Sequence, residues 1–268
     1  MKVVSWTSTD GRVERGALDG EVIRVLDGDW GGLRPTGATV DAATVALGSP
    51  VTPRSIVCVG LNYRLHAEES GLPVPDQPAL FTKLVSSLLA PGGEIVKPDA
   101  TEKLDYEVEL GVVIGRETRG VSVEDALDYV AGYVCVNDVS ARDLQKGDGY
   151  GWVRGKSADT FCPVGPFVVT ADEVPDPQAL RLTTRVNGET RQDSSTADMI
   201  FSVAEVISFI SEVVTLQPGD LICTGTPSGV ADGMSPPKYL QPGDHVVVEI
   251  EGLGRLENTV VAQGSPRG

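Results

Sequence analysis

One segment of the chain combines strand-forming residues with regularly spaced acids, and it reads Leu104-Asp105-Tyr106-Glu107-Val108-Glu109-Leu110-Gly111-Val112-Val113-Ile114. Its β-branched residues and its alternation with a period of two predict a β-strand. In a strand, Asp105, Glu107 and Glu109 lie on one face, with same-face neighbours roughly 6.5–7 Å apart. Carboxylates at that spacing repel one another, and a divalent cation bound through oxygen ligands relieves the repulsion. The alternative is a solvated outer face of a half-buried sheet.

The overall composition narrows the class of protein. The 268 residues are enough for a sizeable core, and 41% hydrophobic with 22% charged residues is ordinary for a globular protein. A net charge of −16 argues against nucleic acid or an anionic membrane surface as a partner. An anionic small molecule would therefore need a local cluster of basic residues.

Several signals are missing from the sequence. It has no apolar run of membrane-spanning length and no signal-peptide core, so we expect a cytoplasmic protein. It has no Walker A loop, G-x-S-x-G elbow or H-E-x-x-H motif, which argues against nucleotide-driven, serine-hydrolase and zinc-protease chemistry. Four cysteines without C-x-x-C spacing are interpreted as buried free thiols in a reducing compartment: Cys58, Cys135, Cys162 and Cys223.

Two domains are predicted, a small β-rich domain over residues 1–53 and a larger catalytic domain over residues 54–268. The Pro- and Gly-containing segment 48–53 has the composition of a linker. In the small domain, short strands joined by Asp-Gly turns are expected at residues 3–6, 13–18 and 21–26.

Turn and cap signals predict three features of the larger domain. A helix is expected over residues 122–131, where acidic residues in the first turn precede a glycine stop. Asn187-Gly188 predicts a hairpin turn. Ser202 and Glu205 form a capping box that opens an amphipathic helix.

A short helix with Asn62 as its cap and Gly71 as its stop is predicted to carry His66 and Glu69. These two residues are three apart, so they share a helix face. A carboxylate beside an imidazole selects one tautomer and raises its basicity, as a general base requires. Together with the proline-rich segment 73–78, the helix could act as a lid. The alternative is a surface pair on a mobile helix.

Three further residues are candidates for the same site. Asp138 follows a buried strand and is well placed as a third oxygen ligand, with turn capping as the alternative. Lys156, flanked by small residues, could point a cation into a pocket, with an ordinary surface lysine as the alternative. The Gly-rich loop 224–229 could present backbone N–H groups and the Thr226 hydroxyl to a carboxylate.

Five motifs in this order resemble the fumarylacetoacetate hydrolase family over roughly residues 54–263. They are Gly60-Leu61-Asn62-Tyr63-x-x-His66, Asp105-Tyr106-Glu107-x-Glu109-Leu110, Asn137-Asp138-x-Ser140-Ala141-Arg142-Asp143-x-Gln145, Gly155-Lys156-Ser157 and Gly225-Thr226-Pro227-Ser228-Gly229. The resemblance implies an α+β, mainly β protein with a mixed β-roll catalytic domain, usually a homodimer. It also argues against the solvated-face interpretation of the acids.

Site roles follow from the resemblance position by position. It implies Mg²⁺ or Mn²⁺ bound by Glu107, Glu109 and Asp138. His66 and Glu69 would be an acid/base dyad on a lid, and Lys156 would stabilise an oxyanion or enolate. The residues implied to contact substrate are Arg142, Gln145, Tyr63 and Thr226. The family's substrates carry a 2-oxo acid or 1,3-diketone unit.

The expected function is Mg²⁺-dependent hydrolysis of a C–C bond in an acylpyruvate or 1,3-diketo acid, with water activated by the His66–Glu69 pair. The alternative is an isomerase, decarboxylase or dehydratase of 2-oxo acids at the same site, resembling a 2-hydroxyhepta-2,4-diene-1,7-dioate isomerase or an oxaloacetate decarboxylase. A third hypothesis, a binding protein with a structural metal, would not need that pair. Replacement of the family's usual residues by Ala158 and Asp232 is expected to reshape the pocket.

Overall fold

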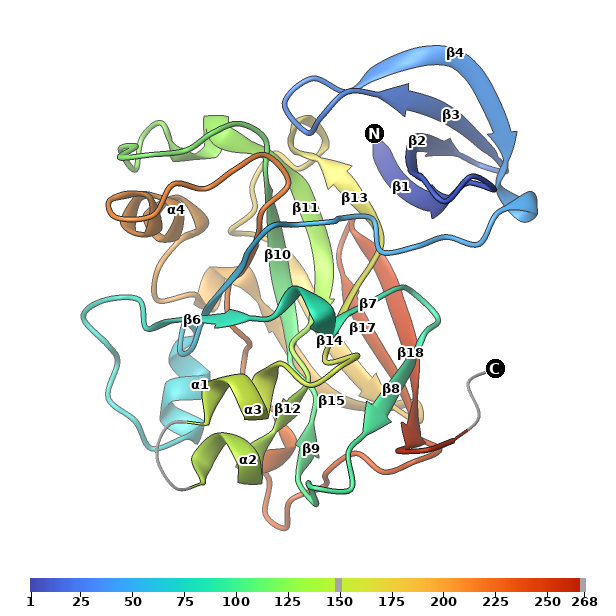
Figure 1. Ribbon diagram of the computed structural model, residues 1–268. Coiled ribbons are helices and arrows are strands. Elements are labelled where there is room, and N and C mark those ends of the chain that lie inside the picture. The colour runs from blue at the N-terminus through green and yellow to red at the C-terminus, as the bar shows by residue number, and fades with distance from the viewer. Residues whose placement is uncertain (148–150, 266–268) are drawn as a thin grey trace.

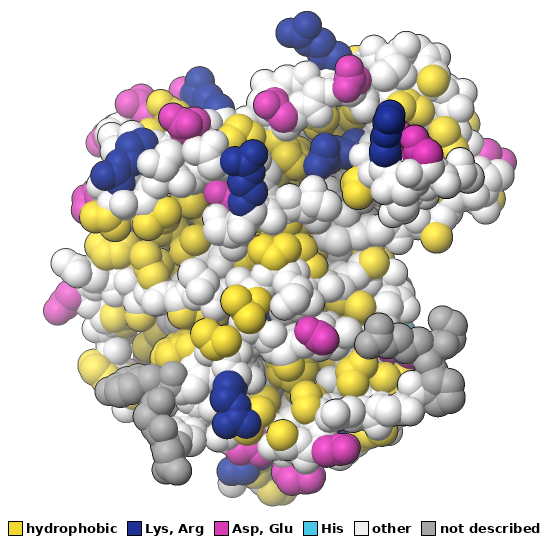
Figure 2. Space-filling model, viewed as in Figure 1, with side chains coloured by type: hydrophobic (Ala, Val, Ile, Leu, Met, Phe, Trp, Pro, Cys, Tyr) yellow, Lys and Arg dark blue, Asp and Glu magenta, His cyan; other side chains and the backbone are white. Residues whose placement is uncertain are grey.

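The computed structural model describes residues 1–147 and 151–265 (Figure 1). Over these residues the chain is mainly β, with one eleven-stranded sheet, one five-stranded sheet and one two-stranded pair. The predicted fold class is therefore confirmed. Hydrophobic side chains are spread over the middle and lower parts of the face in Figure 2, between scattered charged residues. Among the described residues, no helix is long and apolar enough to cross a membrane.

The large sheet has the strand order β4-β3-β2-β1-β13-β11-β10-β16-β5-β6, with β7 also paired to β13. Its strands are β1 (Lys2–Thr7), β2 (Val13–Asp19), β3 (Val22–Asp27), β4 (Arg34–Asp41), β5 (Ile56–Val59), β6 (Leu80–Lys83), β7 (Leu88–Leu89), β10 (Val108–Ile114), β11 (Val130–Asn137), β13 (Cys162–Thr170) and β16 (Leu221–Cys223).

The second sheet has the order β15-β14-β17-β18-β8, and β9 pairs with β12. These strands are β8 (Glu94–Lys97), β9 (Leu104–Asp105), β12 (Ser140–Ala141), β14 (Arg181–Val186), β15 (Glu189–Ser195), β17 (His245–Ile250) and β18 (Gly254–Ala262). The α-helices are α1 (Arg64–Glu69), α2 (Arg142–Lys146), α3 (Trp152–Lys156) and α4 (Val203–Ser211). Short 3-10 helices are η1 (Ala42–Thr44), η2 (Val85–Ser87), η3 (Ala126–Tyr129), η4 (Ala171–Glu173), η5 (Thr196–Asp198) and η6 (Ala231–Gly233).

The N-terminal strands β1–β4 form an antiparallel unit at the upper right of Figure 1. Three of them coincide with the expected strands, while β4, which contains Pro35 and Gly37, was not expected. Strand β1 is hydrogen-bonded to β13, with Lys2 opposite Val169. The unit therefore continues the large sheet, and the domain boundary after residue 53 stays a prediction.

Strand β10 is buried along its whole length because both of its faces meet core residues. Leu110 and Val112 pack in the same cluster as residues of α4, and Val113 packs in a second cluster with Val134. This two-sided burial explains why the strand is a nearly continuous apolar run after Glu109.

The expected continuous strand over residues 104–114 is wrong in one detail, because it is interrupted at residues 106–107. There the backbone N–H of Glu107 donates to the side-chain oxygen of Asn137 at 3.0 Å. The N–H of Tyr106 donates to Asp105 Oδ1 at 2.9 Å. These side-chain acceptors take the place of a strand ladder, so β9 pairs with β12 instead.

The helix expected over residues 122–131 is also wrong. Only the 3-10 turn η3 forms there, and Val130 already belongs to β11, where it pairs with Ile114 of β10. Pairing to a buried strand overrides the local helix signals. Asn62 is not the cap of α1, which begins at Arg64. Its buried amide instead donates to the carbonyl of Thr224 at 2.8 Å.

Other local predictions are confirmed. Asn187 and Gly188 have positive φ values of 52° and 83° and connect β14 to β15. The capping box of Ser202 and Glu205 opens α4. The four cysteines are buried and free.

Candidate functional site

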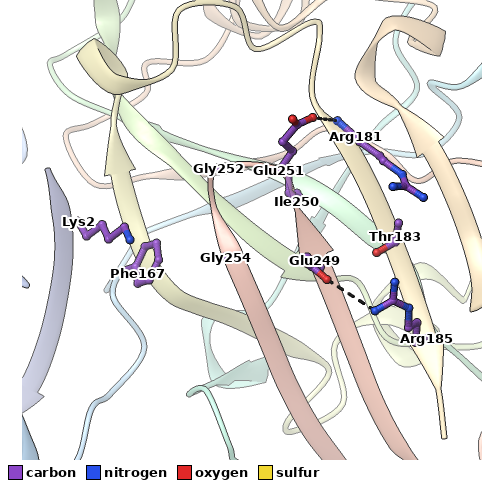
Figure 3. A pocket seen from close by; sticks show the side chains of 10 residues that line it. All are labelled: Lys2, Phe167, Arg181, Thr183, Arg185, Glu249, Ile250, Glu251, Gly252 and Gly254. Carbon is purple, nitrogen blue, oxygen red and sulfur yellow. Dashed lines mark hydrogen bonds and ion pairs between the residues drawn. The ribbon is translucent and has the colours of Figure 1, made fainter. Parts of the chain in front are cut away.

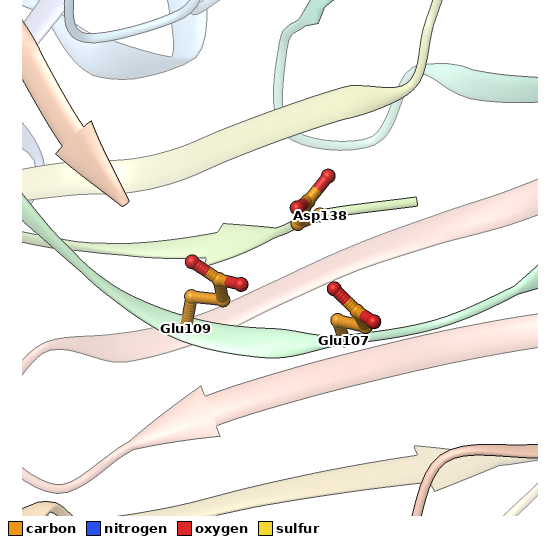
Figure 4. Close-up of side chains that lie close together, drawn as sticks. All are labelled: Glu107, Glu109 and Asp138. Carbon is orange, nitrogen blue, oxygen red and sulfur yellow. The ribbon is translucent and has the colours of Figure 1, made fainter. Parts of the chain in front are cut away.

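Three buried carboxylates meet where β10 begins and β11 ends (Figure 4). Glu107 directly precedes β10, Glu109 lies within it, and Asp138 follows the last residue of β11. The register that pairs Val108 with Asn137 brings them together. Each carboxylate offers one oxygen within 4.8 Å of the others, and none is more than 4% exposed. The three predicted metal ligands are thus close enough to share one cation.

Lys156 lies between two of these acids. Its Nζ is 2.6 Å from Glu107 Oε2 and 2.9 Å from Asp138 Oδ2. Burial acts to lower the pKa of Lys156, but Asp138 and Glu107 outweigh it and the pKa is raised. Lys83, which the sequence analysis did not single out, pairs with the other oxygen of Asp138. Burial also acts to lower the pKa of Lys83, but the charge of Asp138 outweighs it and the pKa is raised, so both amines stay protonated.

Arg142 joins a fourth acid to the cluster. Its Nη2 is 2.6 Å from Glu107 Oε1, and its Nε is 2.8 Å from Asp105 Oδ2. Burial acts to raise the pKa of Glu107, but Lys156 and Arg142 outweigh it and lower the pKa to about 2. Glu107 is therefore ionised near neutral pH.

Glu109 differs from the other acids of the cluster. In the part of the chain that the structure describes, no Lys or Arg forms an ion pair with it, and its Oε2 accepts only the Gly225 N–H at 2.9 Å. Burial, followed by the charges of Asp138 and Glu107, raises its pKa well above the ordinary value. A divalent cation would supply the positively charged partner that Glu109 lacks, and three carboxylate oxygens suit a hard cation. The residues therefore fit a divalent metal site.

His66 and Glu69 lie together on α1, as their spacing predicted. His66 Nδ1 is 3.0 Å from Glu69 Oε2, and Glu69 Oε1 accepts the Gly229 N–H at 2.9 Å. With Nδ1–H donating to Glu69, the other ring nitrogen is left as an acceptor. Glu69 also lies against Gly233, where an added Cβ would be 2.4 Å from Glu69 Cδ. Glu69 is thus held by both neighbours and in turn holds the imidazole.

The turn after Gly229 also holds the arginine. The N–H groups of Ala231 and Asp232 donate to the two oxygens of Asp105, at 2.8 and 3.1 Å. Asp105 in turn accepts from Arg142. One turn therefore fixes two carboxylates, and each of them orients a functional side chain. Local sequence patterns do not reveal this role of Asp105, because its partners lie far along the chain.

A cavity of about 820 Å³ opens over the acid cluster. The predicted site residues that line it are His66, Glu69, Glu107, Asp138, Arg142, Gln145 and Lys156. Phe81 and Trp152 contribute an aromatic wall, with ring centroids 4.7 Å apart. Gln145 also accepts from Arg142 Nη1 at 3.2 Å, so both lie within reach of one bound anion.

Two predicted substrate contacts are not among the described residues that line the cavity. Tyr63 is fully buried in the core. The Thr226 hydroxyl donates to the Val108 carbonyl at 2.9 Å and accepts from Gln192 Nε2 at 2.8 Å. Contact of either with substrate stays a prediction.

A second cavity, of about 550 Å³, lies between Phe167 and strands β14 and β17 (Figure 3). Arg185 pairs with Glu249 at 3.9 Å, the backbone N–H of Arg181 donates to the Glu251 carboxylate, and the Arg181 guanidinium pairs with Asp193. None of the predicted site residues is among the described residues that line this second cavity.

Comparison with known proteins identifies the family of the chain. Residues 55–261 match the family model described as fumarylacetoacetate (FAA) hydrolase C-terminal, and residues 1–50 match that described as Rv2993c-like, N-terminal. The chain is 47% identical over 215 residues to the mitochondrial oxaloacetate tautomerase FAHD2A of Bos taurus, covering 80% of this chain and 68% of that one. It is 54% identical over 206 residues to the 2,4-didehydro-3-deoxy-L-rhamnonate hydrolase of Sphingomonas sp. (strain SKA58), covering 76% and 72%.

A solved structure is similar over the whole chain. The crystal structure of 2-hydroxyhepta-2,4-diene-1,7-dioate isomerase from Mycobacterium marinum has a TM-score of 0.86 at 39% identity. The match covers 99% of this chain and 100% of that one. The matched part of this chain therefore includes the N-terminal strands β1–β4 as well as the segments that carry the acid cluster.

Proposed function

This chain belongs to the fumarylacetoacetate hydrolase family and is an enzyme of it, and on that premise we propose that it catalyses proton transfer on a 2-oxo acid, as a keto–enol tautomerase or double-bond isomerase. A tautomerase and an isomerase among the relatives support this reaction over the C–C bond hydrolysis expected from the sequence. The hydrolase at 54% identity keeps bond hydrolysis as the second candidate.

The observation that carries the proposal is the pairing of one oriented base with a cationic cluster across a single cavity. His66 is the one histidine among the described residues lining that cavity. Its free ring nitrogen can take a proton from the carbon beside the 2-oxo group and return it to the same or a neighbouring position. Tautomerisation needs no further group, whereas hydrolysis also needs an activated water.

The surrounding residues stabilise the charge that develops. Lys156, kept protonated by its two carboxylate partners, supplies positive charge where an enolate forms. Arg142 and Gln145 are placed to bind the substrate carboxylate. A bound Mg²⁺ or Mn²⁺, held by Glu107, Glu109 and Asp138, would polarise the 2-oxo group. The apolar wall of Phe81 and Trp152 excludes water from the reacting carbon.

One set of measurements distinguishes proton transfer from cleavage of the C–C bond. The protein with Mg²⁺ is given enolic oxaloacetate and acetylpyruvate in D₂O, and NMR follows deuterium entry at C3 and the release of acetate. We expect catalysed deuterium entry, and His66→Ala should lower its rate by about 10²–10⁴-fold. His245→Ala is the matched control, because His245 is exposed and pairs with Glu257 at 3.3 Å.

Acetate release without catalysed exchange would overturn the assignment in favour of hydrolysis. Exchange that is undiminished in His66→Ala would remove the histidine from its proposed role. A homodimer, expected from the family resemblance, stays a prediction that light scattering tests.

A further inference from the structure

The cavity carries a second charged group besides the acid cluster. Lys146 at the end of α2 pairs with Asp232 of η6, and both line the same cavity as His66 and Lys156. Asp232 Oδ1 also accepts the hydroxyl of Tyr239 at 2.6 Å. The reaction proposed above uses neither member of this pair.

Lys146 lies about one helical turn from Arg142, whose guanidinium pairs with Glu107 of the acid cluster. Arg142 and Lys146 are four residues apart on α2, so they share a helix face with roughly 5–6 Å between their Cβ atoms. Asp232 is tied to the same place from the other side, because its N–H and Arg142 Nε both donate to Asp105 Oδ2. A substrate whose 2-oxo end binds near Arg142 therefore extends its other end towards the pair.

The charge of Lys146 is already compensated. Burial acts to raise the pKa of Asp232, but Lys146 and the Tyr239 hydroxyl outweigh it and the pKa is lowered, so Asp232 stays ionised. A carboxylate arriving at Lys146 would meet this like charge. A hydroxyl group meets no such penalty, because it can donate to Asp232 and accept from Lys146 at once.

We propose that the Lys146–Asp232 pair is the tail site of the enzyme and selects 2-oxo acids with hydroxyl groups at the distal end over those that end in a second carboxylate. The inference rests on the proposed function, since it assumes that the 2-oxo end binds at the acid cluster. It also accounts for the sequence departure at Asp232, whose side chain reshapes the cavity by adding a fixed anion to its wall.

Two substrates of equal chain length test the selection. A 3-deoxy-2-oxo-hexonate carries distal hydroxyl groups, and 2-oxoadipate ends in a carboxylate. The rate of deuterium entry at C3 gives kcat/KM for each with Mg²⁺. We expect the wild type to favour the hydroxylated acid by about tenfold or more, the ratio that 1.4 kcal/mol represents.

Removal of the charge on Asp232 should largely abolish the preference. In Asp232→Asn, Lys146 is left uncompensated while the Tyr239 hydroxyl keeps an acceptor, so KM for 2-oxoadipate should fall and the ratio should drop by about tenfold. Lys146→Gln should raise KM for both acids. Lys238→Gln is the control, because Lys238 pairs with the exposed Glu189 at 2.8 Å, and it should leave the ratio unchanged. Thermal melts check that each variant is folded.

The outcomes separate this inference from the function on which it rests. Catalysed exchange in the wild type with equal kcat/KM for both acids, or a ratio that Asp232→Asn does not move, overturns the tail site and leaves the proposed function standing. Exchange of neither acid above the spontaneous rate, nor of oxaloacetate, overturns both.

Discussion

Glu69 and Gly233 are in such close contact that a single added carbon would separate them: a Cβ at Gly233 would lie 2.4 Å from Glu69 Cδ and 2.7 Å from its Oε1. The same carboxylate binds His66 on one oxygen and the Gly229 N–H, 160 residues further along the chain, on the other. The position of the proposed base is therefore set by a turn on a different part of the chain.

Gly233→Ala should displace Glu69 and thereby misplace His66. Because a shift of about 1 Å in a reacting group can lower a rate by about 10²-fold, we expect kcat to fall by about 10–100-fold while KM changes little. Gly32→Ala is the control, because no atom lies within 4 Å of a Cβ there. An unchanged kcat in Gly233→Ala would show that Glu69 does not position the base.

Glu109→Gln should abolish activity without destabilising the metal-free protein. Glu109 has no ion pair among the described residues, and a glutamine oxygen can still accept the Gly225 N–H. The change removes a repelled buried charge, so the metal-free melting temperature should stay the same or rise. Calorimetry should show that Mg²⁺ or Mn²⁺ binding is lost. A fully active Glu109→Gln enzyme would contradict the assignment of Glu109 as a metal ligand.

Removal of the metal should lower the stability of the wild type. A ligand that binds only the folded state at 100 times its Kd stabilises that state by about 2.7 kcal/mol. Melting curves with Mg²⁺ and with a chelator measure the difference, and adding the metal back should restore it. The same pair of curves should coincide for Glu109→Gln, which separates specific binding from a general effect of salt.

Lys83→Met tests a buried ion pair that local sequence patterns do not reveal. The side chains of Lys83 and Asp138 are both fully buried, and breaking such a pair by removing one partner costs about 3–5 kcal/mol. Urea unfolding of the metal-free protein measures this loss. Lys238→Met removes an exposed pair and should cost no more than about 1 kcal/mol. An equal loss of unfolding free energy in the two variants would mean that the buried Lys83–Asp138 pair contributes no more to stability than an exposed pair.

Asp143 should make the stability of the fold depend on acid pH. Burial acts to raise its pKa, but the Thr101 hydroxyl and the Glu102 N–H outweigh it and the pKa is lowered. A lowered folded-state pKa contributes stability above the unfolded value of about 3.9, and this stability is lost as the pH falls through the folded value. Asp143→Asn should therefore be less stable than the wild type near neutrality, and the difference should shrink below about pH 4. A difference that is constant with pH would contradict this.

Much of the site could be predicted from short-range patterns. Glu107 and Glu109 are two apart where β10 begins, and His66 and Glu69 are three apart on α1, so spacing predicts that the members of each pair lie close together. Local patterns could not reveal Lys83, which meets Asp138 only because β6 pairs with β5 at the end of the large sheet.

Two errors have the same origin. The helix expected over residues 122–131 does not form, and the end of this segment belongs to β11, which pairs with β10. Asn62 does not cap α1, because its side-chain amide donates to the Thr224 carbonyl 162 residues away. Both depend on contacts between distant parts of the chain, which no local window contains.

The hydrogen bonds between β1 and β13 also bear on what would happen to a shortened protein. Without residues 1–53, the part of β13 around Val168 would lose its hydrogen bonds to β1. Its backbone N–H and C=O groups would then be unpaired on the edge of a long apolar strand. Exposed edges of this kind recruit strands from other molecules. The N-terminal unit covers this edge of β13, so its deletion should reduce solubility, although none of its residues lines the larger cavity.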